Sequence, residues 1–482
     1  MLVVLLLRLG EITIKGPRTR RRFEKLLQRN IKEALHSAGI EYTERREGGR
    51  IFIYCQNEDK ALEILRRVFG IKSLSKAVEI EFTDLNDLVA KAEEVFREKV
   101  KGKRFAVRAR RVGSHSFTSL DVEKALGAAL LGYGAGVDLE NPDVTVYVEV
   151  RGQRAYLYTD VVRAYGGLPI GSEGRVLALV SGGFDSAVAA WSMLRRGAEV
   201  HYLLCRLGGA VQEAGVLHVL KVLAERWSHG YRPKLYVVDF SEILKSLRKN
   251  CDPSFLTVLL KRFMLRAAEA IALKEGFEAV VTGDSLGQAS SQTLTNLSVT
   301  SEAVRIPVFR PLIGFDKDDI VALAREIGTY EASARVKEYC GAFSEHPRTR
   351  VKLDEVKREE GKLDPTLLDK ALSRVVIYDL KEVSVEEAYG ELEVETLPPD
   401  SIIVDLRSGT SRRVWSIPGS ISMDFDQLIE GTAGLDPAKK YVLVCDEGAL
   451  SLEAAYILRK LGFQAYSLRG GAKRLRRKST KN

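Results

Sequence analysis

The segment RVLALVSGGFDSAVAAWSMLRRG, residues 175–197, constrains the fold more than any other part of the chain. Its apolar run ends in the letters SGG at 181–183, and a helix-like pattern follows Asp185 and Ser186. Paired glycines let a backbone adopt positive φ and approach a ligand, and the N–H groups of a following helix N-terminus face an anion. We predict a strand, a phosphate-binding loop and a helix at the carboxyl edge of a parallel sheet. The alternative is a tight strand-to-helix turn without a ligand.

The rest of the 482 residues divides into four expected domains around this segment. Residues 1–56 and 57–163 show the mixed strand and helix patterns of α+β domains, with an arginine-rich loop at 10–22. Residues 164–391 alternate apolar strands with helices, which predicts a parallel α/β sheet covered on both faces. Residues 392–482 form a smaller α/β unit of the same kind. The Gly-rich stretch AYGGLPIGSEG and the stretch ELEVETLPPDS are expected to be linkers.

Charge and cysteine content narrow the class of protein. The formal net charge of +9 favours a polyanionic partner, although a solubilising surface is the alternative. The five cysteines include no CxxC pair, so we expect neither a disulfide framework nor a cysteine metal site, and we expect a reducing cytoplasm. The opening MLVVLLL is too short to span a bilayer and lacks the features of a signal peptide, so no membrane partner is expected.

The letters SGGFDS resemble the SGGxDS signature of PP-loop ATP pyrophosphatases, whereas no Walker sequence GxxxxGK[ST] is present. The resemblance implies that pyrophosphate is the leaving group and that AMP is transferred. Asp185 would then position Mg²⁺ or the phosphates, and Ser181 and Ser186 would donate hydrogen bonds. This motif is shared by synthetases and thiolases with different acceptors, so it leaves the acceptor open.

Further blocks resemble one family, the tRNA 4-thiouridine synthases (tRNA sulfurtransferases), in the family's order. They include GEITIKGPRTRRRFEKLLQRNI, NPDVTVYVEVRGQRAYLY, TGDSLGQASSQTLTNL, RPLIGFDKDDIVALAREIGT and EYCGAFSEHP. The resemblance implies a ferredoxin-like domain at 1–56, a THUMP domain at 57–163, a PP-loop domain at 164–391 and a rhodanese-like domain at 392–482. It implies that the chain uses ATP to convert uridine at position eight of tRNA into 4-thiouridine.

The resemblance also implies which residues contact ATP. They are Leu179, Val180, Ser181, Gly182, Gly183, Ser186, Leu204, Cys205, Lys261, Gly283, Gln292 and Lys317. The apolar members could equally be core residues, and the two lysines could lie on solvated helix faces.

The THUMP resemblance implies that tRNA is bound through arginines, by the shape and phosphates of its fold rather than by sequence. The candidate residues are Arg18, Arg20, Arg21, Arg22, Arg108, Arg110 and Arg111. Ordinary surface charge is the alternative for any one of them.

The rhodanese-like blocks IIVDLRS, SIPGSISM and YVLVCDEGALSLEAAYILRKLGF surround Cys445, which is expected to carry sulfur as a persulfide. Loop N–H groups and a helix N-terminus would stabilise its anion. The loop departs from the family pattern, because Asp446 and Glu447 stand where an arginine is common, and two acids disfavour a nearby anion.

The resemblance implies a sulfur relay with two cysteines. ATP adenylates O4 of the uridine, and the persulfide, loaded by a cysteine desulfurase, attacks C4 or releases sulfide close to it. Cys340 then attacks the sulfur of Cys445, and a reductant reopens the disulfide. Sulfur supply to the thiazole of thiamine and a homodimer stay open. The alternatives are a PP-loop enzyme with another acceptor, such as a 2-thiolase, an RNA-binding module without activity, and a sulfur carrier.

Overall fold

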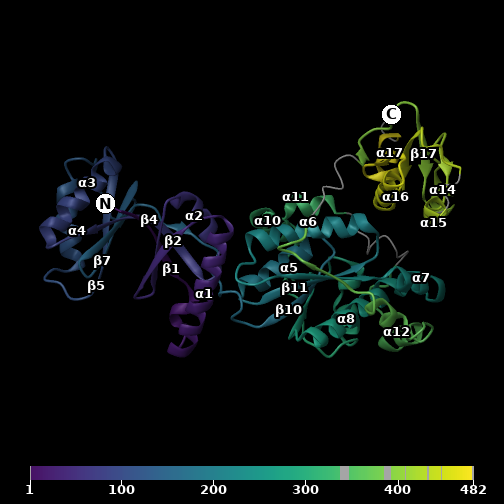
Figure 1. Cartoon of the computed structure of the whole chain (residues 1–482), viewed down its shortest axis with the longest axis horizontal. Coiled ribbons are helices and arrows are strands. Elements are labelled where there is room, and N and C mark those ends of the chain that lie inside the picture. The colour runs from purple at the N-terminus through teal and green to yellow at the C-terminus, as the bar shows by residue number, and fades with distance from the viewer. Residues whose placement is uncertain are drawn as a thin grey trace. The chain divides into compact units, whose positions relative to one another are not determined.

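The computed structural model describes residues 2–336, 347–384, 392–407, 409–430, 434–446 and 448–479 (Figure 1). The chain separates into two compact units. Unit 1 contains residues 1–173 with the short segments 194–198 and 229–231, and unit 2 contains the remainder. The expected fold class is confirmed: a mixed α+β first part precedes two α/β sheets.

Unit 1 is built on one nine-stranded sheet with the order β2-β3-β1-β4-β8-β7-β5-β6, and β9 pairs with β4. Its elements are β1 (Leu2–Leu9), α1 (Pro17–Ser37), β2 (Tyr42–Glu47), β3 (Arg50–Cys55), α2 (Glu58–Leu65), β4 (Ile71–Glu81), α3 (Leu85–Val100), β5 (Arg104–Val112), α4 (Ser119–Leu130), β6 (Gly136–Val137), β7 (Val144–Arg151), β8 (Arg154–Tyr158) and β9 (Val162–Arg163). The boundary expected at residue 56 falls between strands of this sheet and stays a prediction.

One local expectation for unit 1 was wrong, and one strand was missed. The arginine-rich stretch is not a loop up to residue 22, because α1 already begins at Pro17, a residue whose fixed φ suits the first position of a helix. Strand β4 was not expected, yet its alternating pattern IKSLSKAVEIE pairs with both β1 and β8. The Gly-rich stretch expected to be a linker contains the boundary between the two units at residues 173 and 174, and its residues Leu168 and Ile170 are buried.

The first sheet of unit 2 has the order β14-β13-β10-β11-β12-β15. Its neighbours pair in parallel except β15, which is an antiparallel edge strand. The elements are β10 (Arg175–Leu179), α5 (Phe184–Arg195), β11 (Glu199–Arg206), α6 (Ala210–Arg226), β12 (Lys234–Asp239), α7 (Ser241–Asn250), α8 (Leu256–Glu275), β13 (Ala279–Val281), α9 (Leu294–Ser301), β14 (Val308–Phe309), α10 (Lys317–Ile327), α11 (Tyr330–Arg335), α12 (Leu353–Glu360), α13 (Leu367–Leu372) and β15 (Val376–Asp379). The two short helices α12 and α13 precede the edge strand β15.

The second sheet of unit 2 is small and wholly parallel, with the order β16-β20-β19-β17-β18. Its elements are β16 (Glu393–Val394), β17 (Ser401–Asp405), α14 (Gly409–Val414), β18 (Ile421–Ser422), α15 (Phe425–Glu430), β19 (Lys440–Val444), α16 (Ala449–Lys460), β20 (Gln464–Leu468) and α17 (Gly471–Ser479). Parallel strands joined by helices place the loops after β10, β11, β13 and β19 at carboxyl edges, where ligands of such sheets bind.

Candidate functional site

A cavity of about 270 Å³ lies at the carboxyl ends of β10, β11 and β13. Nine of the expected nucleotide-site residues line it: Leu179, Val180, Ser181, Asp185, Ser186, Cys205, Lys261, Gly283 and Gln292. Of the others, Gly182 and Gly183 form the adjoining loop, Leu204 is buried in β11, and Lys317 contacts Asp185. The fold therefore brings together residues that are far apart in sequence.

The loop after β10 has the geometry expected of an anion-binding turn. Gly182 has φ +85°, and a Cβ there would lie 2.8 Å from a methyl carbon of Val336. Ser186 Oγ donates to the Gly183 carbonyl at 3.0 Å and accepts from the Ser181 N–H at 3.4 Å. Since α5 begins at Phe184, its first N–H groups face the loop, which can bind phosphate oxygens.

Gly283 is needed because two backbone segments approach each other closely at this position. An ideal Cβ at this position would lie 2.7 Å from the carbonyl carbon of Asp185 and 2.8 Å from the Ser186 nitrogen. The missing side chain therefore admits the first turn of α5 against the end of β13. Close contact between two backbones fixes the phosphate loop relative to the sheet.

Asp185 is joined to two residues from distant segments. Lys317 Nζ, at the start of α10, lies 2.9 and 3.1 Å from its two carboxylate oxygens, and Gln288 Nε2 donates to it at 3.1 Å. Lys317 also lies 5.6 Å from the centroid of the Phe184 ring. Lys317 is half-exposed, so the phosphate of an incoming nucleotide could replace the Asp185 carboxylate as the partner of this lysine.

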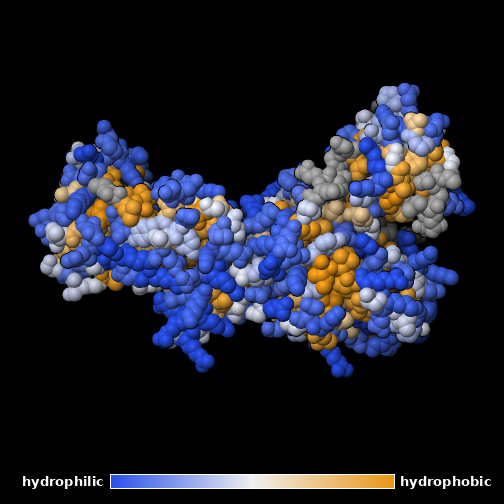
Figure 2. Space-filling view, viewed as in Figure 1, coloured by the Kyte–Doolittle hydropathy of each residue, from blue (hydrophilic) through white to orange (hydrophobic). Residues whose placement is uncertain are grey.

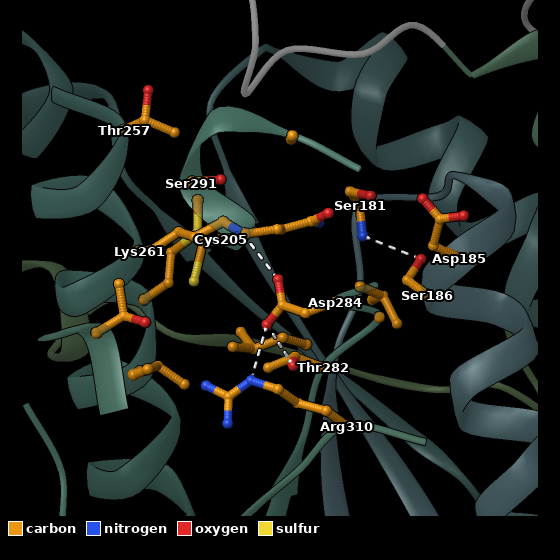
Figure 3. A pocket seen from close by; sticks show the side chains of 18 of the residues that line it. Ser181, Asp185, Ser186, Cys205, Thr257, Lys261, Thr282, Asp284, Ser291 and Arg310 are labelled. Carbon is orange, nitrogen blue, oxygen red and sulfur yellow. Dashed lines mark hydrogen bonds and ion pairs between the residues drawn. The ribbon is translucent and has the colours of Figure 1, made fainter. Parts of the chain in front are cut away.

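Asp284 is a buried carboxylate at the centre of the cavity wall, between two cations (Figure 3). It accepts from Lys261 Nζ at 2.8 Å, from Thr282 Oγ1 at 2.7 Å and from Arg310 Nε at 3.3 Å. Burial raises the pKa of the Asp284 carboxyl, but Lys261, Thr282 and Arg310 outweigh it and hold that pKa below its usual value. Both cations also line the cavity.

Asp284, Arg310 and Gln288 were not singled out in the sequence. Asp284 and Gln288 lie in the same block as Gly283, directly after a strand, and this position at a carboxyl edge was a usable signal. No comparable signal marks Arg310, which follows the two-residue strand β14.

Cys340 lies outside the described residues, but both flanks of its segment contact the nucleotide site. On one side Val336 packs against Gly182, and on the other Pro347 lines the cavity. Asn296 Nδ2 donates to the Arg348 carbonyl at 2.9 Å and fixes the second flank to α9.

Cys445 lies in the loop between β19 and α16 and is 5% exposed. Its Sγ receives N–H donors from Gly448 at 3.1 Å and from Ser451 at 3.4 Å, and Ser451 Oγ lies 3.4 Å away. Gly448 has φ +94°, which suits a glycine at the turn before the helix. These donors can stabilise a sulfur anion without an arginine. Asp446 is exposed, and Glu447 lies outside the described residues.

The candidate tRNA-binding arginines have different surroundings within unit 1. Arg18, Arg21 and Arg22 line a shallow concavity on α1 together with Lys25, in a unit whose visible face is mostly hydrophilic (Figure 2). Arg20 pairs with Glu24 at 2.8 Å.

The arginines on β5 are divided between the two faces of the sheet. Arg108 and Arg110 are exposed and share one face of β5, since side chains alternate along a strand, and Arg111 points to the other. Arg108 donates to the Leu139 carbonyl, and Arg111 donates to the Gly113 carbonyl.

The described residues contain no group of three or more His, Cys, Asp or Glu side chains arranged to hold a metal ion. No helix within the described part of the chain is long and apolar enough to cross a membrane.

Four protein-family models match the chain. They are the ThiI ferredoxin-like domain at residues 4–75, the THUMP domain at 82–160, the thiamine biosynthesis protein (ThiI) at 171–364 and the rhodanese-like domain at 384–478. These matches confirm the four kinds of domain that the sequence predicts.

Similar proteins were found over most of the chain. A tRNA sulfurtransferase of Pyrobaculum aerophilum is 41% identical and covers 97% of this chain and 96% of its own length. A probable tRNA sulfurtransferase of Aeropyrum pernix is 48% identical over 70% of this chain and 86% of its own. The crystal structure of a 4-thiouridine synthetase–RNA complex with bound ATP has a TM-score of 0.69 and 32% identity, and it covers 78% of this chain and 99% of its own.

Proposed function

The chain belongs to the tRNA sulfurtransferase family, and from this membership we propose that it uses ATP to replace O4 of a tRNA uridine with sulfur. The observation that carries the proposal is the cavity at the carboxyl ends of β10, β11 and β13, where a phosphate loop adjoins a cluster of cations. The product is 4-thiouridine, and position eight of the tRNA is the proposed site.

The cavity residues divide into two groups for this reaction. The loop at 181–186 holds the phosphates through its N–H groups and hydroxyls, while Lys317 and Lys261 supply positive charge. Leu179, Val180 and Cys205 provide an apolar wall for the adenosine. Uridine O4 attacks the α-phosphorus, the bond to the β-phosphate oxygen breaks, pyrophosphate leaves and N3 of the uridine loses its proton.

Asp185 fits a role with Mg²⁺, because this ion is commonly held by one or two carboxylates together with substrate phosphates. Asp185 is the carboxylate beside the phosphate loop, and its contacts with Lys317 and Gln288 are open to exchange at the surface. Mg²⁺ supplies charge neutralisation of the phosphates when it is bound.

The sulfur step uses Cys445 and Cys340. The terminal sulfur of a Cys445 persulfide, loaded by a cysteine desulfurase, attacks C4, the C4–O bond breaks and AMP leaves with the oxygen. The Cys340 thiolate then attacks Sγ of Cys445, the bond between the two persulfide sulfurs breaks, and 4-thiouridine leaves as its thiolate and takes a proton. A reductant returns the resulting disulfide to two thiols by supplying two electrons and two protons.

The contacts of Cys445, and those of the described residues on either side of the Cys340 segment, support these roles. Cys445 Sγ already receives N–H donors that would stabilise a persulfide anion, and both flanks of the Cys340 segment contact the cavity or its loop. We further propose that tRNA binds through the THUMP domain and the arginines on α1 and β5, that the enzyme works in the cytoplasm, and that it forms a homodimer, which sedimentation would test.

The same persulfide is chemically competent to supply sulfur for the thiazole of thiamine. The name of the family model that matches residues 171–364 favours this second role. A strain that lacks its own thiazole sulfur donor would grow without thiamine when it carries this gene, and a Cys445→Ala variant would not support that growth.

One experiment tests the main proposal. The protein is incubated with a tRNA transcript, ATP, Mg²⁺ and sulfide, and the RNA is analysed for the near-ultraviolet absorbance of 4-thiouridine and for its position. Product at position eight that depends on ATP is the expected result. Bound tRNA without product would favour a binding module, and sulfur at C2 would favour a 2-thiolase.

A further inference from the structure

A buried carboxylate of the rhodanese-like domain binds the N-terminus of a helix of the PP-loop domain. Glu453, on α16, accepts from the Ala210 N–H and from the Val211 N–H, each at 2.9 Å, and is 3% exposed. The first N–H groups of a helix have no acceptor within that helix, so the Glu453 carboxylate satisfies two of them and interacts favourably with the helix dipole. Burial raises the pKa of Glu453 above its usual value, and the two N–H donors oppose that rise. This contact has no part in the chemistry described above.

The surroundings of Glu453 are shaped for this contact. An ideal Cβ at Gly209 would lie 2.1 Å from Glu453 Oε1, so any larger residue would displace the carboxylate. Beside it, Val211 of α6 forms one buried apolar cluster with Leu392 and Leu452, and Tyr456 packs against this cluster. The buried carboxylate is therefore hydrogen-bonded through both oxygens, and the apolar cluster beside it keeps water away from the contact.

Each of the two segments in contact also adjoins a reactive centre. On the PP-loop side, Gln212 follows Val211, lines the nucleotide cavity and accepts from the Leu207 and Gly208 N–H groups at 2.9 and 2.7 Å. On the rhodanese-like side, Ser451 stands two residues before Glu453 and donates its N–H to Cys445 Sγ. The contact therefore links the wall of the nucleotide cavity to the loop of the sulfur-carrying cysteine.

We propose that the N-terminus of α6 is the docking site through which the rhodanese-like domain delivers sulfur to the activated uridine, with Glu453 as its positioning residue. The inference rests on the proposed function. Docking raises the effective concentration of the Cys445 persulfide near the cavity, so it accelerates transfer from the persulfide but not the reaction of free sulfide.

The test compares two sulfur sources in Glu453→Ala and in Gly209→Ala, whose added methyl group displaces the same carboxylate from the other side. The φ of Gly209 is −96°, which lies outside the left-handed region that favours glycine. With cysteine and a cysteine desulfurase, both variants should form 4-thiouridine about tenfold more slowly or worse. With sulfide, both should stay within about twofold of the parent enzyme. Glu395→Gln, which alters an exposed ion pair with Arg469 and Arg474 in the same domain, is the matched control.

Two further measurements separate docking from other defects. Persulfide loading of Cys445 by the desulfurase, followed with radiolabelled sulfur, should be unchanged in Glu453→Ala. Hydrogen exchange of a peptide that contains residues 206–214 should accelerate, because the Ala210 and Val211 amides lose their acceptor.

Distinct outcomes contradict the docking proposal and the proposed function. Equal rates with the desulfurase in the parent enzyme and both variants, or a loss of loading that accounts for the slower rate, would overturn docking. Unchanged exchange of the 206–214 amides in Glu453→Ala would also overturn it. If the parent enzyme forms no 4-thiouridine with either sulfur source, the proposed function is overturned instead. The hydrogen-exchange measurement would then still test whether Glu453 accepts from the Ala210 and Val211 amides.

Discussion

The Lys317 ammonium lies 2.9 Å from the carboxylate of Asp185, although 132 residues separate the two along the chain. Lys317 begins α10 and Asp185 lies in the first turn of α5, so the pair joins the phosphate loop to a helix from a distant segment of the chain. In the absence of nucleotide the two charges neutralise each other. Phosphates and a divalent cation would offer each of them a new partner.

Loss of either member of this pair should stop adenylation. Lys317→Met removes a cation that stabilises the charge of the leaving pyrophosphate, and Asp185→Asn removes the carboxylate available to Mg²⁺. We expect tRNA-dependent pyrophosphate release to fall about 100-fold or more in each variant, the usual cost of one electrostatic group at a transition state. A coupled pyrophosphate assay measures this rate.

The control for this prediction is Asp318→Asn, an exposed neighbour of Lys317 on α10. It should release pyrophosphate at the parent rate. Affinity for tRNA, measured by filter binding, should be unchanged in all three variants. Near-normal pyrophosphate release in Lys317→Met would show that the pair only connects two helices.

The Asp284 carboxylate should control the affinity for ATP. In Asp284→Asn the cations of Lys261 and Arg310 lose their shared counter-charge and repel each other, so the cavity wall is no longer held in place. We expect the Kd for ATP to rise about tenfold, which corresponds to about 1.4 kcal/mol. Titration calorimetry measures the Kd, with Glu326→Gln, an exposed carboxylate on α10, as the control. An unchanged or smaller Kd would contradict a positioning role for Asp284.

The features that depend on residues adjacent in the chain could be predicted from the sequence. The strand, loop and helix around Gly182 follow from an apolar run, two glycines and a helical pattern in 23 letters. Apart from Thr282, the partners of Asp185 and Asp284 could not be predicted from the residues, because they are set by packing between segments that are 23 to 132 residues apart. The same limit explains Gly283, whose missing side chain makes room for the α5 backbone.

Cys445 should be needed with one sulfur source and not with the other. Cys445→Ala removes the atom that carries the persulfide, so thiolation driven by a desulfurase should be abolished while thiolation driven by sulfide continues. Cys251→Ala is a matched control, because burial and the nearby Glu359 carboxylate raise the pKa of that thiol to about 11 and keep it unreactive at neutral pH. Absorbance of 4-thiouridine measures both reactions. An equal effect of Cys445→Ala with the two sources would contradict its role as sulfur carrier.

The arginines of α1 should contribute to tRNA affinity in unequal amounts. Arg18 and Arg21 line the concavity on α1, whereas Arg20 is engaged by Glu24. The double variant Arg18→Ala/Arg21→Ala should weaken tRNA binding and reduce the slope of log K against log salt by about one per lost phosphate contact. Arg20→Ala should have a smaller effect on both. Filter binding between low and physiological salt measures the slopes. A slope in the double variant equal to that of the parent would mean that the tRNA does not bind at the concavity on α1.

The stability of the PP-loop domain should depend on the protonation of His201. This side chain on β11 is 4% exposed, and burial, followed by the charges of Arg175 and Lys234, lowers its pKa from 6.5 to about 4. Between pH 4 and 6.5 the unfolded chain therefore binds more protons at this residue than the folded chain does. The free energy of unfolding should fall as the pH decreases through this window, by about 2 kcal/mol from His201 alone at pH 5.

The fluorescence of the tryptophans makes this effect measurable in the intact chain. The chain has three tryptophans, and Trp191 and Trp227 pack edge to face with ring centroids 5.5 Å apart in the PP-loop domain. Urea unfolding followed by this signal at pH 7 and pH 5 gives the change in unfolding free energy. His201→Gln retains an acceptor for the Lys234 N–H but does not titrate. The decrease in its unfolding free energy from pH 7 to pH 5 should therefore be smaller than that of the parent by about 2 kcal/mol. An equal loss in the parent and the variant would mean that His201 is protonated in the folded domain as readily as in the unfolded chain.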